Sequence, residues 1–428
     1  MFKKSAFDHE VCQEAYSTSN MERKRNFRCS RSFHYAPLLS FYFHSIFSVL
    51  KTELFELAIK ESTILQLKED FVMKKSMKQG TVALAAGMLI AASILPAAAS
   101  AAPEHTLEMY FPVDIENHWA YRELDNFVVA DLLKGYRTDE GEVEIRPEQS
   151  ITRAEFVTLL VRSLGLKSDK AQAAFQDVPS EEWYADSVQI ASSLGIVNGI
   201  TTTEFKPDQL IERGEIAAMV VRAFPDVTET EDGAESEAAP FEDVPADDYF
   251  AADAIASASG AGIVNGITEL EFKPFQHAKR AEAVVMLQRA LNQQDGDLPS
   301  FEQLESVILT ADEAELAAIN QGELEGLSSL LGKQYTAFQL TSLEQYIEGM
   351  KELVGDGIAI SVEETGERSI ELVSASDRYA IVKSTGGSWL FKYAYDGQQQ
   401  AETVSSDGHY YMKKTEDGSW KVYAIFEQ

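Results

Sequence analysis

Three arginines that recur at equivalent places in the sequence are the residues best suited to bind an anion. Each is followed two positions later by a glutamate and then by an apolar stretch, as in Arg153-Ala154-Glu155, and the other two are Arg213 and Arg280. A guanidinium can grip a carboxylate through two parallel hydrogen bonds, and the free amides at a helix start also attract negative charge. The alternative is an Arg–carboxylate pair between neighbouring repeats that only fixes their packing. Recurrence in all three copies favours anion binding.

An aspartate and an aromatic residue precede the first predicted helix of each copy. Tryptophan suits the apolar C–H face of a sugar, but an aromatic residue that starts an amphipathic helix is also a common core residue. Both interpretations therefore stay open for Trp119 and Trp183, whereas Tyr249 in the third copy is expected in the core. The aspartates are expected to cap this helix or its turn, with bonding to sugar hydroxyls as the second possibility; they are Asp114, Asp177 and Asp243.

A glycine follows the first helical stretch of each copy, at Gly135, Gly199 and Gly266. The first expectation is that it ends the helix. The second is that the missing side chain lets the backbone approach a ligand, which makes the glycines candidate carbohydrate-binding residues as well.

These motifs define three repeats, at residues 110–166, 174–224 and 241–292. In each, apolar residues recur with helical spacing over two stretches, so we expect two helices per copy and an all-α fold. Repeats with one helix pair each must bury one another's apolar faces. The acidic stretch 226–240 between the second and third copies is expected to be a solvated linker.

The pattern changes after a short linker at 293–300. Helical segments are predicted over 301–353, followed by short strands at 358–362, 369–373, 379–383, 389–395, 409–413 and 420–426. Turn signals at Gly386-Gly387, Asp396-Gly397, Asp407-Gly408 and Asp417-Gly418 separate several of these strands. Residues 301–428 are therefore predicted to form a small α+β domain with an antiparallel sheet.

The N-terminal hundred residues look like targeting sequence rather than folded structure. Residues 73–101 combine a basic start, an apolar run and an Ala99-Ser100-Ala101 cleavage pattern, which predicts a secretory signal peptide. Residues 1–72 would then be a mis-called upstream extension, and they hold both cysteines, Cys12 and Cys29. The mature chain is expected to lack cysteine and any membrane span.

The composition excludes several classes of function. The formal net charge of −32 argues against nucleic acid as a partner. The mature sequence has no zinc-protease, nucleophile-elbow or phosphate-loop motif, so we expect no enzyme activity, no metal and no cofactor.

The repeats also resemble a known family. Ile151-Thr152-Arg153-Ala154-Glu155 is similar to the signature of S-layer homology domains, and Gly195–Gly199 and Gly262–Gly266 fit the same family. The resemblance implies a three-pronged pseudo-trimer on a secreted protein of a Gram-positive cell surface or S-layer. It also implies non-covalent binding to a secondary cell-wall polysaccharide, in which the three arginines hold a pyruvyl carboxylate.

The copies depart from the family pattern to different degrees, which predicts unequal binding grooves. The second copy has Glu212 where the signature has threonine, and the third has Lys279. We expect the grooves of Arg153 and Arg280 to bind more strongly than that of Arg213.

The C-terminal domain has a weaker resemblance. Its last hairpin, Glu416–Tyr423, is similar to that of nuclear-transport-factor-like or cystatin-like rolls. We expect a displayed interaction module, and the alternative is a wall-anchored enzyme with its active site in this domain.

Overall fold

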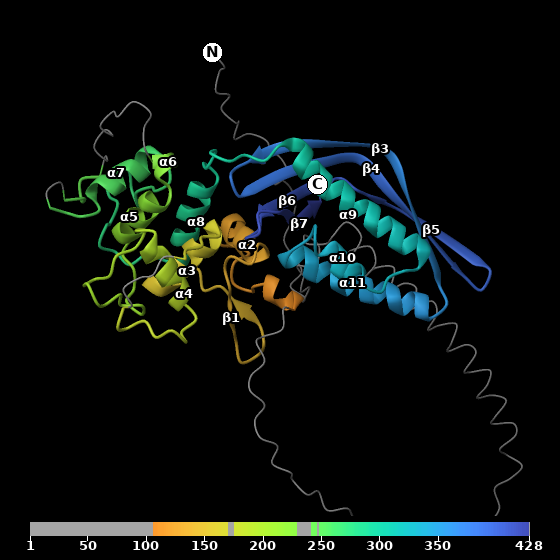
Figure 1. Ribbon diagram of the computed structural model, residues 1–428, viewed down its shortest axis with the longest axis horizontal. Helices are drawn as coiled ribbons and strands as arrows, with labels where there is room; N and C mark the ends of the chain where they lie inside the picture. Colours follow the sequence, from red (N-terminus) through yellow and green to blue (C-terminus); the bar gives the residue numbers. More distant parts are fainter. Residues whose placement is uncertain (1–105, 170–174, 229–240, 246–247, 428) are drawn as a thin grey trace, which may run out of the picture. The chain divides into compact units, whose positions relative to one another are not determined.

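The computed structural model describes residues 106–169, 175–228, 241–245 and 248–427 (Figure 1). The predicted extension at 1–72, the signal peptide at 73–101 and most of the acidic linker lie outside these residues. Within the described residues, no helix is both long and apolar enough to cross a membrane.

The first part of the structure consists of short helices. A 3-10 helix, η2 (Leu107–Tyr110), precedes α2 (Tyr121–Val129), α3 (Arg153–Leu164), α4 (Ala185–Ser193), α5 (Arg213–Ala223), α6 (Pro225–Thr228), α7 (Ala252–Gly260) and α8 (Arg280–Leu291). Two helices are present in each predicted copy, as expected: α2 and α3, α4 and α5, and α7 and α8. The helices that pack together come from different copies, α3 with α4, α5 with α7, and α8 with α2. The all-α expectation is wrong in one detail, because β1 (Tyr136–Arg137) and β2 (Val143–Glu144) pair as a small antiparallel ribbon.

The three helix pairs share one core because each second helix starts against the loop of another segment. Arg153 N–H donates to Gln209 O at 2.9 Å, Arg213 N–H to Gln276 O at 3.0 Å, and Arg280 N–H to Gln149 O at 2.9 Å. The first segment thus meets the second, the second meets the third, and the third returns to the first. Buried apolar residues of all three segments belong to a single cluster.

The C-terminal domain has the predicted α+β order. Its helices are α9 (Phe301–Gln321), α10 (Leu327–Leu331) and α11 (Ala337–Gly355). Its strands are β3 (Ala359–Ala375), β4 (Tyr379–Tyr395), β5 (Gln398–Ser405), β6 (Gly408–Lys414) and β7 (Trp420–Glu427). They form an antiparallel sheet in the order β3-β4-β6-β7, with β5 paired to the other end of β4.

Several predicted strand boundaries are wrong because β3 and β4 are long. The pairs of predicted strands at 358–362 with 369–373, and at 379–383 with 389–395, are each one continuous strand. The expected Gly386-Gly387 turn lies inside β4, where Gly387 faces Gly366 beside a register shift. Such a bulge bends a strand without ending it. The turns at Asp396-Gly397 and Asp417-Gly418 are confirmed.

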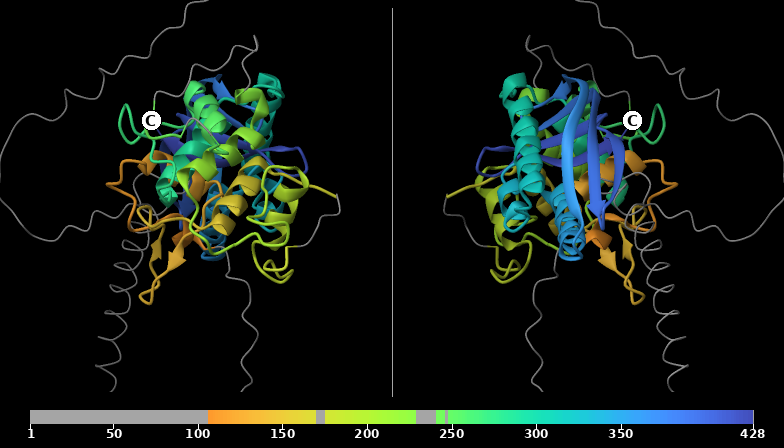
Figure 2. Two further views of the ribbon diagram at one scale, coloured as in Figure 1. Left: turned by 90° about the vertical axis from the view of Figure 1, so that its left-hand side faces the viewer. Right: turned by 90° about the vertical axis from the view of Figure 1, so that its right-hand side faces the viewer.

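Helices α9 and α11 cover one face of this sheet (Figure 2). Helix α9 begins at Ser300, whose side chain accepts a hydrogen bond from Gln303 N–H, and it ends at Gly322 with φ 69°. Its buried residues follow helical spacing, Leu304, Ile308, Ala311, Glu315 and Ile319. One carboxylic acid, Glu315, therefore stands in the apolar stripe that faces the sheet.

Candidate functional site

Arg153 is buried at the junction of the first and second segments and is only 2% exposed. Its Nη1 lies 2.5 Å from Glu215 Oε1, and its Nε and Nη2 donate to Phe205 O at 3.0 Å and Asn198 O at 3.1 Å. The guanidinium also lies 4.8 Å from the Phe205 ring centre. Burial lowers the pKa of Arg153, and the neighbouring Glu215 opposes that shift.

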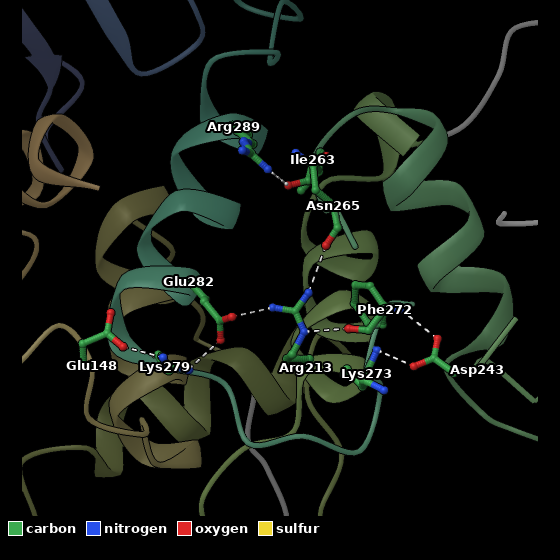
Figure 3. Close-up of polar contacts among 10 residues, drawn as sticks. All are labelled: Glu148, Arg213, Asp243, Ile263, Asn265, Phe272, Lys273, Lys279, Glu282 and Arg289. Carbon is green, nitrogen blue, oxygen red and sulfur yellow. Dashed lines mark hydrogen bonds and ion pairs between the residues drawn. The ribbon is translucent and has the colours of Figure 1, made fainter. Parts of the chain in front are cut away.

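The same arrangement recurs at Arg213, which is 3% exposed (Figure 3). Its Nε donates to Phe272 O, its Nη1 to Glu282 Oε1 and its Nη2 to Asn265 O, each at 2.9 Å. The distances are those of charge-assisted hydrogen bonds. This junction joins the second and third segments.

Arg280 closes the cycle by joining the third segment to the first. Its Nη1 lies 2.8 Å from Glu155 Oε1 and 3.1 Å from Tyr136 Oη, and its Nε donates to Ile145 O at 2.9 Å. The glutamates also serve as helix caps, because the other carboxylate oxygen of Glu155 accepts Thr152 N–H at 2.9 Å. The reciprocal bond from Glu155 N–H to Thr152 Oγ1 confirms the predicted capping box.

The three arginines therefore already have partners in the protein. Amide groups at the helix start are also occupied, since Ala154 N–H donates to Pro207 O at 3.0 Å. This geometry is the inter-repeat pair that the sequence left open as the alternative to anion binding. A sugar carboxylate could contact Arg153 only by displacing a buried glutamate, so direct glycan contact by these arginines stays a prediction.

The aspartates do not cap the first helices, so that expectation is wrong. Asp177 Oδ1 and Oδ2 accept the backbone N–H groups of Phe205 and Lys206 at 2.8 and 2.7 Å. Asp114 and Asp243 make the same two bonds in their own segments. In each case the aspartate clamps a loop residue that has a positive φ, 63° at Lys206. These residues hold the loop that in turn receives the arginine of another segment.

The predicted role of the repeat glycines in ending the first helix is also wrong. Helices α2, α4 and α7 end at Val129, Ser193 and Gly260, well before Gly135, Gly199 and Gly266. A Cβ on Gly199 would lie 2.6 Å from both Glu204 O and the Phe175 ring, and a Cβ on Gly266 would lie 2.8 Å from Glu271 O. The glycines allow a tight backbone turn at each junction.

The tryptophans lie at the surface, so the core interpretation is wrong for both of them. Trp119 is 64% exposed and Trp183 is 61% exposed. Each stands two residues before the first residue of its helix, Tyr121 or Ala185, and in α7 that position belongs to Phe250, which is 62% exposed. Aligning the three copies by sequence placed Tyr249 opposite the two tryptophans and therefore missed Phe250. The start of α7 shows that Phe250 occupies the equivalent exposed position.

Each exposed aromatic residue has different neighbours. We call His118, Trp119, Glu148 and Lys279 the Trp119 cluster. The centres of the His118 and Trp119 rings are 5.4 Å apart. His118 Nε2 lies 2.7 Å from Glu148 Oε1, and Lys279 pairs with the same glutamate. That hydrogen bond raises the pKa of Lys279, which keeps it charged. This cluster therefore combines an exposed aromatic surface with a cation from another segment.

In the part of the chain that the structure describes, the ring contacts of the other two exposed aromatic residues lead to no such lysine. Trp183 packs edge-on against Tyr184 at 5.2 Å. Phe250 and Phe275 flank the Tyr249 ring at 5.1 and 4.9 Å. Glu212, which acts on the Tyr249 hydroxyl electrostatically, is an acid and would repel an anion.

Comparison with known proteins identifies the repeats. Residues 174–217 and 240–284 match the family model of the S-layer homology domain. These two segments are S-layer homology domains. The match and the similarity to surface-layer proteins indicate an exported protein of the cell surface or cell wall.

Individual relatives are matched over part of their length only. The chain is 30% identical over 174 residues to an amylopullulanase of Thermoanaerobacterium thermosulfurigenes, covering 41% of this chain and 9% of the relative. It is 25% identical over 290 residues to an endoglucanase of Bacillus sp. (strain KSM-635), covering 67% and 30%. It is 38% identical over 97 residues to a surface layer protein of Brevibacillus choshinensis, covering 22% and 8%. The chain thus spans less than a third of each of these relatives.

Proposed function

We propose that residues 106–292 anchor an exported protein non-covalently to an anionic, pyruvylated secondary cell-wall polysaccharide. In this proposal the first segment acts as a third S-layer homology domain and completes a pseudo-trimer. Its support is the cyclic set of contacts, in which Arg153, Arg213 and Arg280 play equivalent parts.

The observation that carries the proposal is the Trp119 cluster. An exposed indole can stack on the apolar face of a sugar, and the ammonium of Lys279 can pair with an acidic substituent at the same place. The chain carries a strong negative charge, so a cation beside an exposed tryptophan is a selective place for an anionic glycan. The buried arginines support this surface by joining the segments that build it.

The unequal surroundings of the three aromatic positions predict unequal binding. The Trp119 cluster at the Arg280 junction has a lysine, whereas the Phe250 position at the Arg213 junction lies near Glu212. We therefore keep the expectation that the Arg280 junction binds an anionic glycan more strongly than the Arg213 junction.

In the same proposal, the C-terminal α+β domain is a displayed interaction module and has no catalytic activity. A wall-anchored enzyme is the second candidate, because a polar cavity lies between α9 and the sheet. That cavity has a volume of about 30 Å³, close to the room that two water molecules need, and a wall sugar does not fit in it. A small-ligand role suits its size better than turnover of a glycan.

Binding of the purified chain to cell-wall sacculi tests the anchor. We expect binding that falls at least tenfold when the pyruvyl groups are removed, and similarly for Lys279→Ala and Trp119→Ala. Lys206→Ala, which removes an exposed lysine outside the Trp119 cluster, is the matched control and should bind normally.

Three results would count against the proposal in different ways. Unchanged binding after removal of pyruvate would move recognition to neutral sugars. Loss of binding in a folded Arg153→Lys variant, with Lys279→Ala unaffected, would assign the contact to the buried arginines. No binding to sacculi would leave the segments without an anchoring role.

A further inference from the structure

We propose that the C-terminal domain binds a primary ammonium group in the cavity between α9, α11 and the sheet, with Glu315 as its counter-ion. This inference concerns a site separate from the wall anchor and does not depend on it. Among the described residues, two acceptor atoms in this cavity lack donors and one acid lacks a counter-ion, and the cavity has the size and lining for a small cation.

The cavity contains two buried acceptor atoms with no hydrogen-bond partner among the described residues. Glu315 is 6% exposed and Gln339 is 2% exposed. Glu315 Oε1 and Gln339 Oε1 both lack a hydrogen bond. A buried polar atom without a hydrogen bond destabilises the folded protein, so such a pair of atoms is expected to serve a purpose. Both require a donor, and an ammonium group carries three.

The charges around the cavity leave one carboxyl group unmatched. Asp312 also lines the cavity, but Arg368 Nη1 pairs with Asp312 Oδ2 at 2.5 Å. Arg368 donates further to Ser384 Oγ at 2.8 Å and to Tyr410 Oη at 2.9 Å, so it is held away from Glu315. The cavity thus has two acids and one fixed cation, so among the described residues a Glu315 carboxylate has no counter-ion of its own.

The remaining lining selects a small cation on an apolar stem. Trp389, Tyr335 and Tyr410 contribute aromatic walls, and Leu316 and Leu343 contribute aliphatic ones. The negative faces of aromatic rings attract ammonium groups. A volume of about 30 Å³ accepts one ammonium head group and excludes a guanidinium or a trimethylammonium. Asp312 lines the cavity and 13% of its side chain is exposed to solvent, so the cavity lies next to the protein surface.

Ligand binding should release one proton. Burial, with a smaller contribution from the Asp312 charge, raises the pKa of Glu315 to about 8. In the free protein this carboxyl is therefore mostly protonated at pH 7, and it becomes a carboxylate when it pairs with the ammonium. The proton passes to solvent while the ligand stays charged, because an alkylammonium has a pKa near 10.4.

The other titratable groups around Glu315 keep their charge between pH 6 and 8. Burial raises the pKa values of Tyr335 and Tyr346 well above 10, and that of Tyr410 also rises, so all three stay neutral. Burial raises the pKa of Asp312, the charge of Arg368 opposes that shift, and the two side chains pair directly. Close to one proton is then released per ligand below pH 7, so affinity should rise about tenfold per pH unit there and level off as the pH approaches 8.

Calorimetric titration of the full chain with n-butylammonium chloride tests the site. We expect saturable binding at pH 8, about fivefold weaker binding at pH 7, and uptake of the released proton by the buffer. Glu315→Gln should weaken binding at pH 8 at least tenfold and remove its pH dependence. Glu313→Gln, an exposed acid on the same helix, is the matched control and should behave as the wild-type chain.

Two further ligands test whether the bound amine comes from a peptide and whether binding requires its positive charge. Nα-acetyl-lysine methylamide tests a peptide side chain, and its binding in place of butylammonium would assign the site to a peptide amine. n-Butanol has a similar stem without charge, and equal affinity for it would overturn the proposal. The proposal would also be overturned if neither amine bound saturably at pH 8, or if Glu315→Gln bound the amines as the wild-type chain does. If that variant does not fold, the pH dependence of the wild-type chain still decides.

Discussion

The two halves of this chain bury acidic groups in opposite ways. In the repeat segments, Glu215, Glu282 and Glu155 each meet an arginine from another segment, and the distances are 2.5, 2.9 and 2.8 Å. In the C-terminal domain, Glu315 lies in an apolar stripe with an oxygen that has no partner in the described structure. A matched buried charge fixes a junction, whereas an unmatched one destabilises its domain until a ligand or a proton neutralises it.

The largest expected effect tests the matched side of this comparison. Arg153→Met removes the hydrogen bonds to Phe205, Asn198 and Glu215, and it leaves the glutamate buried alone. We expect a loss of about 3–5 kcal/mol in the free energy of unfolding, measured by denaturant titration. Arg146→Met removes the exposed pair with Glu144 and should cost about 0–1 kcal/mol.

A double variant separates the cost of an orphaned charge from the value of the pair. Arg153→Met with Glu215→Gln should recover part of the lost stability, because no buried charge remains. Equal losses in the single and double variants would contradict the view that the buried glutamate is the main penalty.

The next effect tests the unmatched side. The pKa of Glu315 is about 8 in the folded protein, against an ordinary value of 4.5. Between these values the folded protein binds a proton that the unfolded chain has lost, so the free energy of unfolding falls as pH rises from about 4.5 to about 8. Glu315→Gln removes that loss and should stabilise the chain above pH 8 by up to about 5 kcal/mol.

Thermal unfolding measured across this pH range checks the prediction. The two proteins should have similar stability below pH 4.5 and diverge above it, and Glu313→Gln should show no divergence. A wild-type stability that does not fall relative to Glu315→Gln would mean that Glu315 ionises freely.

These contrasts show which features local sequence can predict. Helical spacing predicted α3 and α9, because buried residues three and four apart need no distant partner. The partner of Arg153 is 62 residues away and that of Arg280 is 125 away, so sequence alone left pairing and anion binding as alternatives. Polar strand β5 was missed, since it has no apolar alternation.

The prediction of the third exposed aromatic residue was wrong because it compared side-chain types and not positions relative to the helix start. Tyr249 resembles tryptophan more than its neighbour does, yet Phe250 occupies the equivalent exposed position. Glu315 was missed as a site residue because one more acid does not stand out in a chain with so many acidic residues. Its position on the same helical face as Ala311 and Ile319 could have shown that it is buried.

A smaller effect on stability is expected from substitutions in the glycine turns next to the buried arginines. Gly199→Ala would bring a Cβ within 2.6 Å of Glu204 O, a backbone atom that cannot move alone. We expect a loss of about 1–3 kcal/mol in the free energy of unfolding. Gly195→Asn is the control, since no atom lies within 4 Å of its Cβ and asparagine tolerates the φ of 73°. Equal losses in the two variants would show that the close approach at Gly199 costs no more than a side chain in the left-handed conformation of Gly195.

The smallest expected effect separates surface function from stability. Trp119→Ala and Trp183→Ala remove side chains that are 64% and 61% exposed, so each should change the free energy of unfolding by less than about 0.5 kcal/mol. Binding to sacculi should nevertheless fall more for Trp119, because the Trp119 cluster contains Lys279, which pairs with the glutamate that also binds His118 beside the indole ring. Equal losses of binding would remove the lysine from the recognition surface. A large loss of stability would instead return the tryptophans to a structural role, and the comparison would then rest on the buried acids alone.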